Sequence, residues 1–363
     1  MDYMKQALSL AKLALGQASP NPAVGAVLVK DGEIVGQGYT QPPGSWHAEI
    51  MALRQAGEKA RCSVLYVTLE PCCHYGRTPP CTDAIVSAGV SEVHAAMIDP
   101  NSLVSGQGIE ALERKDIRVF VGEHEDEARE INEAYVKFIT TGMPFVTVKY
   151  AVSLDGKIAT RSGDSAWISG RESRKYVHCL RYVVDAIMTG ANTVIADNPH
   201  LTCRCGDKGG RVRKQPLRVI VDGRGRTPTT AQIFNEPGGV LLALGESVDP
   251  DKKQIWTQVG AELLELPLKD GSLDLTSLLK ALGERGITSV LVEGGGILLG
   301  SLFDSRLVDK VIAFIAPIII GGEGARTPVA GAGIDKVFDA LKLERTSVEK
   351  YGDDLMISGY VKS

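Results

Sequence analysis

Aromatic residues, basic charge and long hydrophobic runs are all scarce in this sequence. Phe, Trp and Tyr together make up 6% of its 363 residues, and the formal net charge at pH 7 is −4. Nucleic-acid-binding domains are usually basic and often stack bases on aromatic side chains, so we expect no nucleic-acid partner. No apolar run approaches the roughly 20 residues of a membrane-spanning helix, so we expect no membrane association.

Cysteine is also infrequent, and its count of seven is odd. In a chain of this length, an odd number is more typical of a reducing compartment than of a disulfide framework. Residues 1–17 do not resemble a signal peptide, since Asp2 comes early and Lys12 interrupts the apolar run. We therefore expect a cytoplasmic protein, and the length suggests about two domains.

Hydrophobic periodicity in the first part of the chain predicts alternating helices and strands. Apolar residues at helical spacing favour an opening helix within residues 1–17, and the turn Asp31-Gly32 favours a hairpin over residues 21–39. Ser45 precedes the next helical stretch as a possible N-cap. The other predicted elements are helices over 47–57 and 81–89, strands over 63–70 and 92–98, and a charged helical stretch over 123–141.

A turn at residues 142–144 separates this part from a second one with the same alternation. We therefore predict a domain boundary there, with α/β domains over residues 1–143 and 144–363. The polar, glycine-rich stretch 204–215 is predicted to be a surface loop. In the second domain the predicted strands are 145–153, 217–223, 239–244, 289–296 and 310–320, and one predicted helix is 277–286.

Three residues with metal-binding side chains lie in two short motifs of the first domain. His47 begins the motif His-Ala-Glu, and Cys72 and Cys81 lie in LEPCCHYGRTPPC. One nitrogen and two sulfurs suit a catalytic zinc ion, which takes three protein ligands and keeps its fourth position for water. Glu49 need not bind the metal, and it can pass a proton from the activated water to a leaving amine. We therefore predict His47, Cys72 and Cys81 as zinc ligands and Glu49 as the catalytic residue.

The spacing of these motifs is close to the H-x-E and P-C-x-x-C signature of zinc nucleobase deaminases, but does not reproduce it. Cys73 directly follows Cys72, and the next cysteine is Cys81, so the loop is longer than in that signature. A closed structural zinc site stays open as an alternative, with His74 as its fourth ligand. Cys73 is predicted to take no part, since its side chain should point away from that of Cys72.

A second stretch of interest, SVLVEGGGILLGSLF, predicts a strand, a glycine-rich turn and a helix. Such a turn lets backbone N–H groups and a helix N-terminus approach a phosphate. It is not the dinucleotide-binding fingerprint G-x-G-x-x-G, because counted from Gly294 the sixth position is Leu299 and the next glycine is Gly300. Taken alone, the turn is equally well explained by close packing of the helix against the strand.

Several longer motifs resemble one enzyme family. ASPNPAVGAVLV, HAE and TLEPCCHYGRTPPC closely resemble the deaminase half of the bifunctional riboflavin-biosynthesis deaminase/reductases. VKYAVSLDGKIAT, SAWISG, DAIMTGANTVIADNPHLTCR and VEGGGILLGSL resemble the reductase half, so the resemblance covers nearly the whole chain. It implies a cytidine-deaminase-like, three-layer N-terminal domain followed by a dihydrofolate-reductase-like C-terminal domain.

The resemblance also implies a two-step reaction. One Zn²⁺ per chain would support hydrolytic deamination of 2,5-diamino-6-ribosylamino-4(3H)-pyrimidinone 5′-phosphate, and NADPH would then reduce the ribosyl side chain to ribityl. The partner is therefore a small pyrimidine ribosyl phosphate, and the family tends to form homo-oligomers. An alternative is a nucleic-acid deaminase of the tRNA type with an appended domain, although the low aromatic content and acidic balance disfavour it.

By the same resemblance, Asn21 would contact the pyrimidine, and His74 and Arg77 would face the ribose phosphate. Asn21 before Pro22 is also explained as a turn residue, and Arg77 as a solvated charge. Lys149 and Asp155 are candidates for polar groups near the reacting carbon of the reductase, although Lys149 is equally well explained as an exposed charge on a strand. The implied substrate residues of the second domain are Ser165, Arg181, Leu201, Arg204 and Glu293.

The resemblance implies a cofactor site in the second domain as well. Trp167 is also explained as a core residue, Thr193 as a helix residue and Asp197 as a cap. The implied cofactor residues are Val152, Trp167, Thr193, Asp197, Gly223 and the segment Gly295, Gly296, Ile297, Leu298, Leu299, Gly300 and Ser301.

Overall fold

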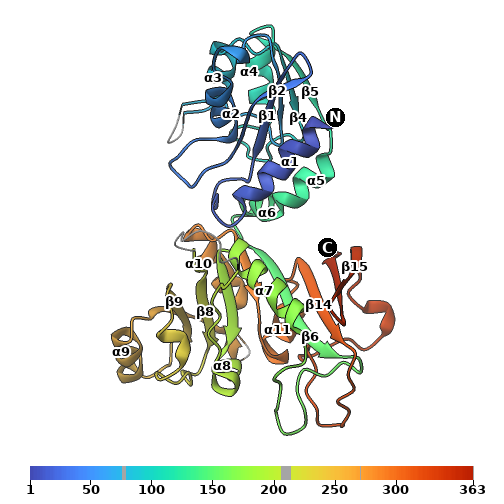
Figure 1. Cartoon of the computed structure of the whole chain (residues 1–363). Coiled ribbons are helices and arrows are strands. Elements are labelled where there is room, and N and C mark those ends of the chain that lie inside the picture. Colours follow the sequence, from blue (N-terminus) through green and yellow to red (C-terminus); the bar gives the residue numbers. More distant parts are fainter. Residues whose placement is uncertain (76–78, 206–213, 270, 363) are drawn as a thin grey trace. The chain divides into compact units, whose positions relative to one another are not determined.

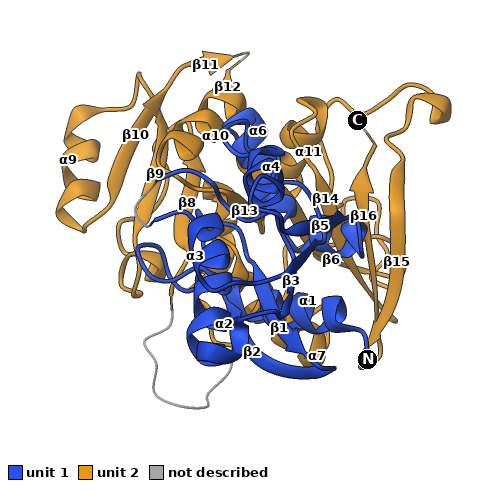
Figure 2. Ribbon diagram, turned by 90° about the horizontal axis from the view of Figure 1, so that it is seen from above, with its two compact units in different colours: residues 1–143 blue, residues 144–363 orange. Residues whose placement is uncertain are grey.

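Two large β-sheets organise this computed structural model, which describes residues 1–75, 79–205, 214–269 and 271–362 (Figure 1). The chain divides into unit 1, Met1–Met143, and unit 2, Pro144–Ser363 (Figure 2). The last helix of unit 1 is followed by Gly142 with φ 71°, a left-handed conformation that glycine adopts without strain. No described helix is both long and apolar enough to cross a lipid bilayer.

Unit 1 contains a five-stranded sheet in the order β2-β1-β3-β4-β5. β1 pairs antiparallel with both β2 and β3, whereas β3, β4 and β5 run parallel. The strands are β1 (Gly25–Lys30), β2 (Glu33–Tyr39), β3 (Val64–Val67), β4 (Glu92–Ala95) and β5 (Arg118–Val121). The helices are α1 (Tyr3–Ala14), α2 (Ala48–Ala56), α3 (Cys81–Ser87), α4 (Gln107–Glu113), α5 (Glu125–Ile131) and α6 (Glu133–Thr141).

Glycines in the first two strands let helices approach both faces of this sheet. A Cβ added to Gly25 of β1 would lie 1.9 Å from the carbonyl oxygen of Ala7 in α1. A Cβ added to Gly38 of β2 would lie 2.5 Å from the carbonyl oxygen of Ala48 in α2. Gly25 pairs with Tyr39 rather than with Gly38, so the two glycines face opposite sides of the sheet. α1 and α2 therefore cover opposite faces and give unit 1 its three layers.

One local prediction for unit 1 was wrong, and another, the helical stretch 123–141, holds but is divided in two. Ser45 does not cap α2, because its N–H donates to the carbonyl of Pro42 in a turn and His47 takes the N-cap position. The stretch 123–141 forms two helices, α5 and α6, which meet at Asn132. The Asn132 side chain accepts from the N–H of Ala23 at 2.8 Å and donates to its carbonyl at 3.1 Å. Local periodicity does not reveal this break, because it is fixed by a residue far away in the sequence.

Unit 2 is built on a nine-stranded sheet in the order β10-β9-β8-β7-β13-β6-β14-β16-β15. Neighbours from β10 to β14 run parallel, and the last two pairs are antiparallel. The strands are β6 (Phe145–Ser153), β7 (Ala186–Gly190), β8 (Leu217–Asp222), β9 (Val240–Gly245), β10 (Glu262–Leu266), β13 (Ser289–Val292), β14 (Lys310–Ala316), β15 (Leu343–Tyr351) and β16 (Asp354–Val361). A separate hairpin joins β11 (Leu268–Lys269) to β12 (Ser272–Leu273). The helices are α7 (Arg171–Val183), α8 (Ala191–Asp197), α9 (Pro250–Gln258), α10 (Leu275–Glu284) and α11 (Gly296–Asp304).

The parallel strands of unit 2 place their carboxyl ends along one edge of the sheet. Glu293 follows β13, Gly223 follows β8 and α8 begins directly after β7. Because α/β sheets bind ligands at this edge, residues from distant segments can meet there in one site. The predicted loop 204–215 lies largely outside the described residues.

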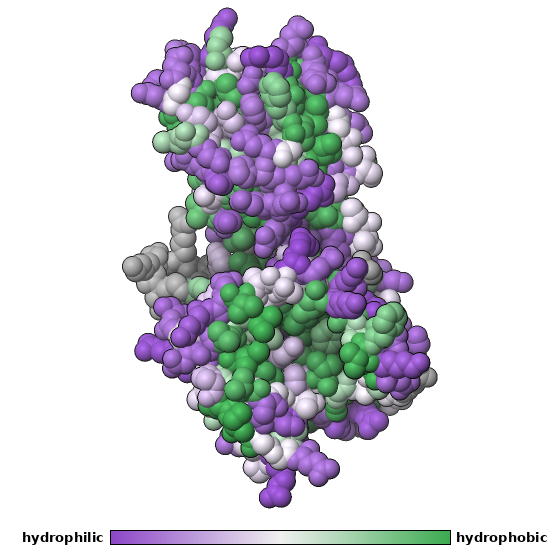
Figure 3. Space-filling model, turned by 90° about the vertical axis from the view of Figure 1, so that its right-hand side faces the viewer, coloured by the Kyte–Doolittle hydropathy of each residue, from purple (hydrophilic) through white to green (hydrophobic). Residues whose placement is uncertain are grey.

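β15 ends the sheet and is exposed along almost its whole length. The face of unit 2 that carries it shows clusters of hydrophobic side chains (Figure 3). Val348 of this strand is 65% exposed, and Val337 and Phe338, just before the strand, are 90% and 88% exposed. β14, by contrast, lies between β6 and β16 and is mostly buried.

Candidate active sites

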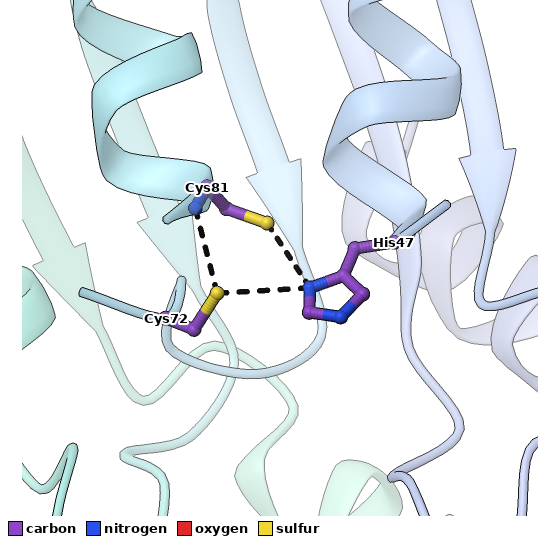
Figure 4. Close-up of side chains that lie close together, drawn as sticks. All are labelled: His47, Cys72 and Cys81. Atoms are coloured by element: carbon purple, nitrogen blue, oxygen red, sulfur yellow. Dashed lines mark hydrogen bonds between the residues drawn. The ribbon is translucent and has the colours of Figure 1, made fainter. Parts of the chain in front are cut away.

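The predicted zinc ligands converge in unit 1 (Figure 4). Nδ1 of His47 lies 3.2 Å from Sγ of Cys81 and 3.6 Å from Sγ of Cys72. Among the described residues, these three form a cluster whose ligand atoms all lie within 4.8 Å of one another. Neither His74 nor Cys73 belongs to that cluster. The arrangement is therefore a three-ligand set, as the catalytic interpretation requires.

Each of the three side chains is positioned by a different element. His47 is the N-cap of α2, Cys81 is the first residue of α3, and Cys72 lies in the loop after β3. The Cys81 N–H donates to the Cys72 sulfur at 3.4 Å, and the Thr82 N–H donates to the Cys72 carbonyl at 3.2 Å. The start of α3 thus fixes Cys72, and helix N-termini favour the negative charge of a thiolate.

Hydrogen bonds between these groups separate their protonation states. The pKa of Cys72 is lowered, chiefly because the Cys81 thiol hydrogen-bonds to the Cys72 sulfur. The same bond raises the pKa of Cys81, and burial adds to the effect. The hydrogen bond with Cys72 also raises the pKa of His47. The cluster therefore favours a thiolate at Cys72, and a thiolate is the form that binds metal.

Glu49 lies beside the cluster and is 4% exposed. It sits in the first turn of α2, two residues after His47. Burial and then the negative charge of Cys72 raise the pKa of Glu49 to about 7. A carboxyl group with this pKa can both accept and release a proton near neutral pH, which suits a general acid–base catalyst.

Glu70 anchors the metal-binding loop, and its role was not predicted. Its carboxylate accepts hydrogen bonds from the N–H groups of Gly108 at 2.8 Å, Gly106 at 2.9 Å, Asp99 at 3.2 Å and Ile109 at 3.2 Å. These bonds tie the segment before Cys72 to the loop between β4 and α4 and to the first turn of α4. An acidic residue directly before Pro-Cys was the available signal, but nothing local identifies its distant partners.

The other predicted residues of unit 1 are not part of the cluster or lie outside the described residues. Asn21 is partly buried, and its N–H closes a turn with the carbonyl of Ala18 at 2.9 Å. His74 is exposed, and Arg77 lies outside the described residues. A cavity of about 270 Å³ opens beside His47, and it is lined by Trp46, His47, Ile50, Pro79, Pro80, Asp83, Ala84 and Ser87.

Unit 2 brings together three charged residues that were predicted from separate motifs. Arg181 of α7 donates to both carboxylate oxygens of Glu293, at 2.6 Å from Nε and 2.9 Å from Nη2. Its Nη1 donates to the carbonyl of Thr202 at 3.1 Å. Lys149 of β6 places Nζ 3.8 Å from Glu293. The three side chains are between 10% and 16% exposed, so they form a nearly buried charge cluster.

The pKa shifts in this cluster follow from burial and mutual attraction. Burial lowers the pKa of Lys149, and Glu293 offsets this only in part. Burial alone would raise the pKa of Glu293, but the charge and hydrogen bonds of Arg181 outweigh it and lower that pKa. Glu293 is therefore held as a carboxylate. Lys149 differs from an exposed lysine on a strand, because burial lowers its pKa.

Several predicted cofactor residues contact one another at the carboxyl edge of the sheet. The Gly295 N–H donates to the Thr193 hydroxyl at 3.1 Å, and the Ser165 hydroxyl lies 3.2 Å from Asp197. These contacts join α8 to the glycine-rich turn and to the loop after β6. Gly295 is the N-cap of α11, whose first N–H groups receive no side-chain cap.

The remaining predicted residues of unit 2 differ in their exposure. Trp167 is 76% exposed, with the Arg174 guanidinium 4.7 Å from its ring centroid, so it is not a core residue. Ile297 is 66% exposed. Val152, Leu201, Leu298, Leu299 and Gly300 are buried, whereas Gly223, Gly296 and Ser301 are partly buried.

Asp155, a candidate for a polar group near the reacting carbon, is anchored by three hydrogen bonds. Its carboxylate accepts hydrogen bonds from the Ser153 hydroxyl at 2.6 Å and from the N–H groups of Ile320 at 3.0 Å and Gly321 at 2.7 Å. The Ser153 bond first, and then the two N–H bonds, lower the pKa of Asp155 to about 2. Asp155 therefore joins the loops after β6 and β14. Arg204 is exposed, and its N–H donates to His178 at 3.3 Å.

Comparison with known proteins matches both units. Residues 1–97 match the cytidine and deoxycytidylate deaminase zinc-binding region, and residues 144–357 match the RibD C-terminal domain. The riboflavin biosynthesis protein RibD of Aquifex aeolicus is 45% identical over 98% of this chain and 97% of its own. That of Escherichia coli K12 is 40% identical over 98% of this chain and 97% of its own. The chain belongs to the RibD family.

Solved RibD structures have the same fold. Acinetobacter baumannii RibD, form 1, is 38% identical with a TM-score of 0.90, and the match covers 99% of this chain and 98% of that one. A Thermotoga maritima protein described as a diaminohydroxyphosphoribosylaminopyrimidine deaminase/5-amino-6-(5-phosphoribosylamino)uracil reductase is 36% identical with a TM-score of 0.86, covering 99% of this chain and 98% of that one.

RibD membership confirms the predicted fold class, a cytidine-deaminase-like domain followed by a reductase domain of dihydrofolate-reductase type. It also confirms the predicted class of enzyme, a bifunctional deaminase and reductase of riboflavin biosynthesis. The matches run over nearly the whole chain, so the alternative of a nucleic-acid deaminase with an appended domain is not favoured.

Proposed function

We propose that residues 1–143 deaminate 2,5-diamino-6-ribosylamino-4(3H)-pyrimidinone 5′-phosphate and that residues 144–363 then reduce its ribosyl side chain to ribityl. The similar Thermotoga maritima protein is named for these two activities. The observation that carries the proposal is the convergence of His47, Cys72 and Cys81 beside the buried Glu49. The partner is accordingly a small molecule.

The donor set of unit 1 fits zinc. One imidazole nitrogen and two cysteine sulfurs are the soft and borderline ligands that zinc prefers, and three protein ligands are typical of a catalytic site. His47, Cys72 and Cys81 would hold the ion, which when bound lowers the pKa of a coordinated water to about 7. The matched family model is itself a zinc-binding region.

Glu49 performs the proton transfers of the deamination. With its raised pKa of about 7, it accepts a proton from the attacking water and donates one to the departing amino group. Ammonia leaves, and a uracil-type ring remains. Asn21 is assigned to the pyrimidine, and His74 and Arg77 to the ribose phosphate.

The carboxyl edge of unit 2 fits a dinucleotide. The N–H groups at the start of α11 have no side-chain cap, and Gly295 is held by Thr193, so this turn can accept a phosphate. NADPH would be held by the predicted residues Val152, Trp167, Thr193, Asp197, Gly223 and Gly295–Ser301, and when bound it supplies the hydride for C1′ of the ribose.

Lys149 and Glu293 act at the reacting end of the ribose, in this proposal. Opening the ring requires a proton at the ring oxygen, and the buried Lys149 ammonium gives up a proton more readily than an exposed lysine. Arg181 holds Glu293 as a carboxylate. Its hydrogen bonds to Glu293 and to the carbonyl of Thr202 use most of the guanidinium donors that a phosphate would need. Arg204, which is exposed, is therefore the better candidate for the 5′-phosphate, with Ser165 and Leu201 lining the substrate.

Two further features belong to the proposal. The exposed β15 edge, with Val348, Val337 and Phe338 nearby, offers an apolar surface through which the chain would form homo-oligomers. The described cysteines are all free, which agrees with work in the reducing cytoplasm.

Metal content per chain, measured together with ammonia release from the diaminopyrimidinone phosphate, tests the proposal. We expect about one zinc per chain, ammonia formation, and subsequent NADPH consumption by the product. Zinc without ammonia would contradict the assigned substrate. Protein isolated without chelators that carries no zinc would contradict the metal site and leave only the reductase.

A further inference from the structure

The loop after β8 presents two arginines that the proposed reaction does not use. Arg224 and Arg226 are exposed, whereas Gly225 and Thr227 are buried. Asp222, the last residue of β8, fixes the loop, because its Oδ2 accepts hydrogen bonds from the N–H groups of Arg226 at 2.6 Å and Thr227 at 2.7 Å. The buried Asp222 carboxylate therefore holds the loop backbone, and the side chains of Arg224 and Arg226 are exposed to solvent.

Arg226 is connected to the proposed cofactor site by two side-chain contacts. Its Nη2 donates to Oδ1 of Asn192 in α8 at 2.9 Å. The next residue, Thr193, accepts the N–H of Gly295 at 3.1 Å. β8 also lies only two positions from β13 in the sheet, and the glycine-rich turn follows β13. Arg226 therefore stands beside the turn assigned to the cofactor phosphates.

The charge of Arg226 is not balanced by an acidic partner in the described part of the chain. The hydrogen-bond acceptor of its guanidinium is the neutral amide of Asn192. Asp222 is 2% exposed, and its Oδ2 is already bonded to the loop, so this carboxylate is not offered to a ligand. The loop after β8 thus exposes its two basic groups and buries the acidic group at its start.

This arrangement distinguishes the two nicotinamide cofactors. Dinucleotide sites selective for NADH use an acidic side chain near the end of a strand to bind the ribose 2′-hydroxyl, whereas an arginine there accommodates the 2′-phosphate of NADPH. A guanidinium also binds phosphate through two parallel hydrogen bonds. We propose that Arg226, positioned by Asn192, binds the adenosine 2′-phosphate and sets the preference for NADPH over NADH. This inference rests on the proposed reductase function.

Calorimetric titration of the whole chain with NADPH, NADH, adenosine 2′,5′-bisphosphate and AMP tests the assignment by binding rather than turnover. In Arg226→Ala, NADPH and the bisphosphate should bind about 10- to 100-fold more weakly, because charge-assisted hydrogen bonds are lost. NADH and AMP should bind as before. Arg285→Ala is the matched control, since Arg285 is paired with Glu262 at 2.7 Å, and it should leave all four affinities unchanged.

Two more variants separate recognition from folding. Asn192→Ala should reduce the same selectivity by a smaller factor, roughly 3- to 10-fold, because Arg226 keeps its charge but loses its support. Arg226→Lys should give an intermediate selectivity. Equal weakening of all four ligands, or unchanged NADPH affinity in Arg226→Ala, would overturn the inference. If the wild type bound neither NADPH nor NADH, both the proposed reductase site and the role of Arg226 would be contradicted.

Discussion

The two candidate sites balance their buried charges in opposite ways. In unit 1, the thiolate favoured at Cys72 lies beside His47 and near the buried Glu49, and a cation held by His47, Cys72 and Cys81 would balance the negative charge. In unit 2, the carboxylate of Glu293 is matched by Arg181 and Lys149. If zinc binds as proposed, the first site would balance its charge with a bound metal, whereas the second is balanced by its own residues.

The largest expected effect concerns Glu49, the group proposed to move protons in unit 1. Glu49→Gln keeps the size of the side chain but removes the carboxylate, so the deaminase kcat should fall about 10²- to 10⁴-fold. Zinc content should stay near one per chain, because Glu49 is not in the ligand set. Ammonia release measures the loss, and reduction of the deaminated substrate by the same variant serves as the control. Retained ammonia release would remove Glu49 from the mechanism.

The second prediction breaks the charge balance of unit 2. Glu293→Gln leaves Arg181 and Lys149 as unmatched buried cations, which should cost about 3–5 kcal/mol of the unfolding free energy of unit 2. The reductase activity of this variant should fall as well. Urea unfolding at about pH 7, monitored by a probe in unit 2, measures the change. A variant as stable as the wild type would show that the ion pair contributes no net stability.

The pH dependence of this loss has a defined direction. Burial opposes ionisation of Glu293, but Arg181 and then Lys149 outweigh it, so the pKa of Glu293 in the folded chain lies below its ordinary value of 4.5. The unfolded chain therefore takes up the proton first as pH falls. The stabilisation is complete above 4.5 and is lost as pH falls through the lower folded pKa. The difference between wild type and Glu293→Gln should accordingly shrink in acid.

The smallest expected effect is on the stability of unit 1 after metal removal. A chelator should lower the unfolding temperature of unit 1 by roughly 5–15 °C, since metal bound only by the folded state stabilises it. Unit 2 should unfold as before. Cys81→Ser and Cys72→Ser should reproduce the shift and lose zinc, whereas Cys73→Ser should do neither. Zinc loss from Cys73→Ser alone would show that the wrong sulfur was assigned.

Elements with a strong local pattern could be predicted from the sequence. β6 was predicted at residues 145–153, as found, and the turn at Asp31 and Gly32 has the positive φ values, 51° and 78°, that its residue types indicate. The His47, Cys72 and Cys81 set was recognisable because zinc chemistry restricts the residue types. These features depend on neighbouring residues in the sequence or on the few side-chain types that bind zinc.

Features that depend on distant residues could not be predicted. The break at Asn132 is fixed by Ala23, the anchoring role of Glu70 by the loop before α4 and the start of α4, and the anchoring of Asp155 by the loop after β14. Each is a polar side chain bonded to backbone groups far away in the sequence. Periodicity and residue type do not specify such partners, since only the folded chain brings them together.

Gly142 has a consequence for the history of the gene. The described core clusters of unit 1 lie before Gly142, and those of unit 2 lie after it, so none of these clusters contains described residues from both units. A reading frame divided at this codon would cut through none of these described clusters. Two coding regions joined at this position would therefore leave the described core clusters of both units intact.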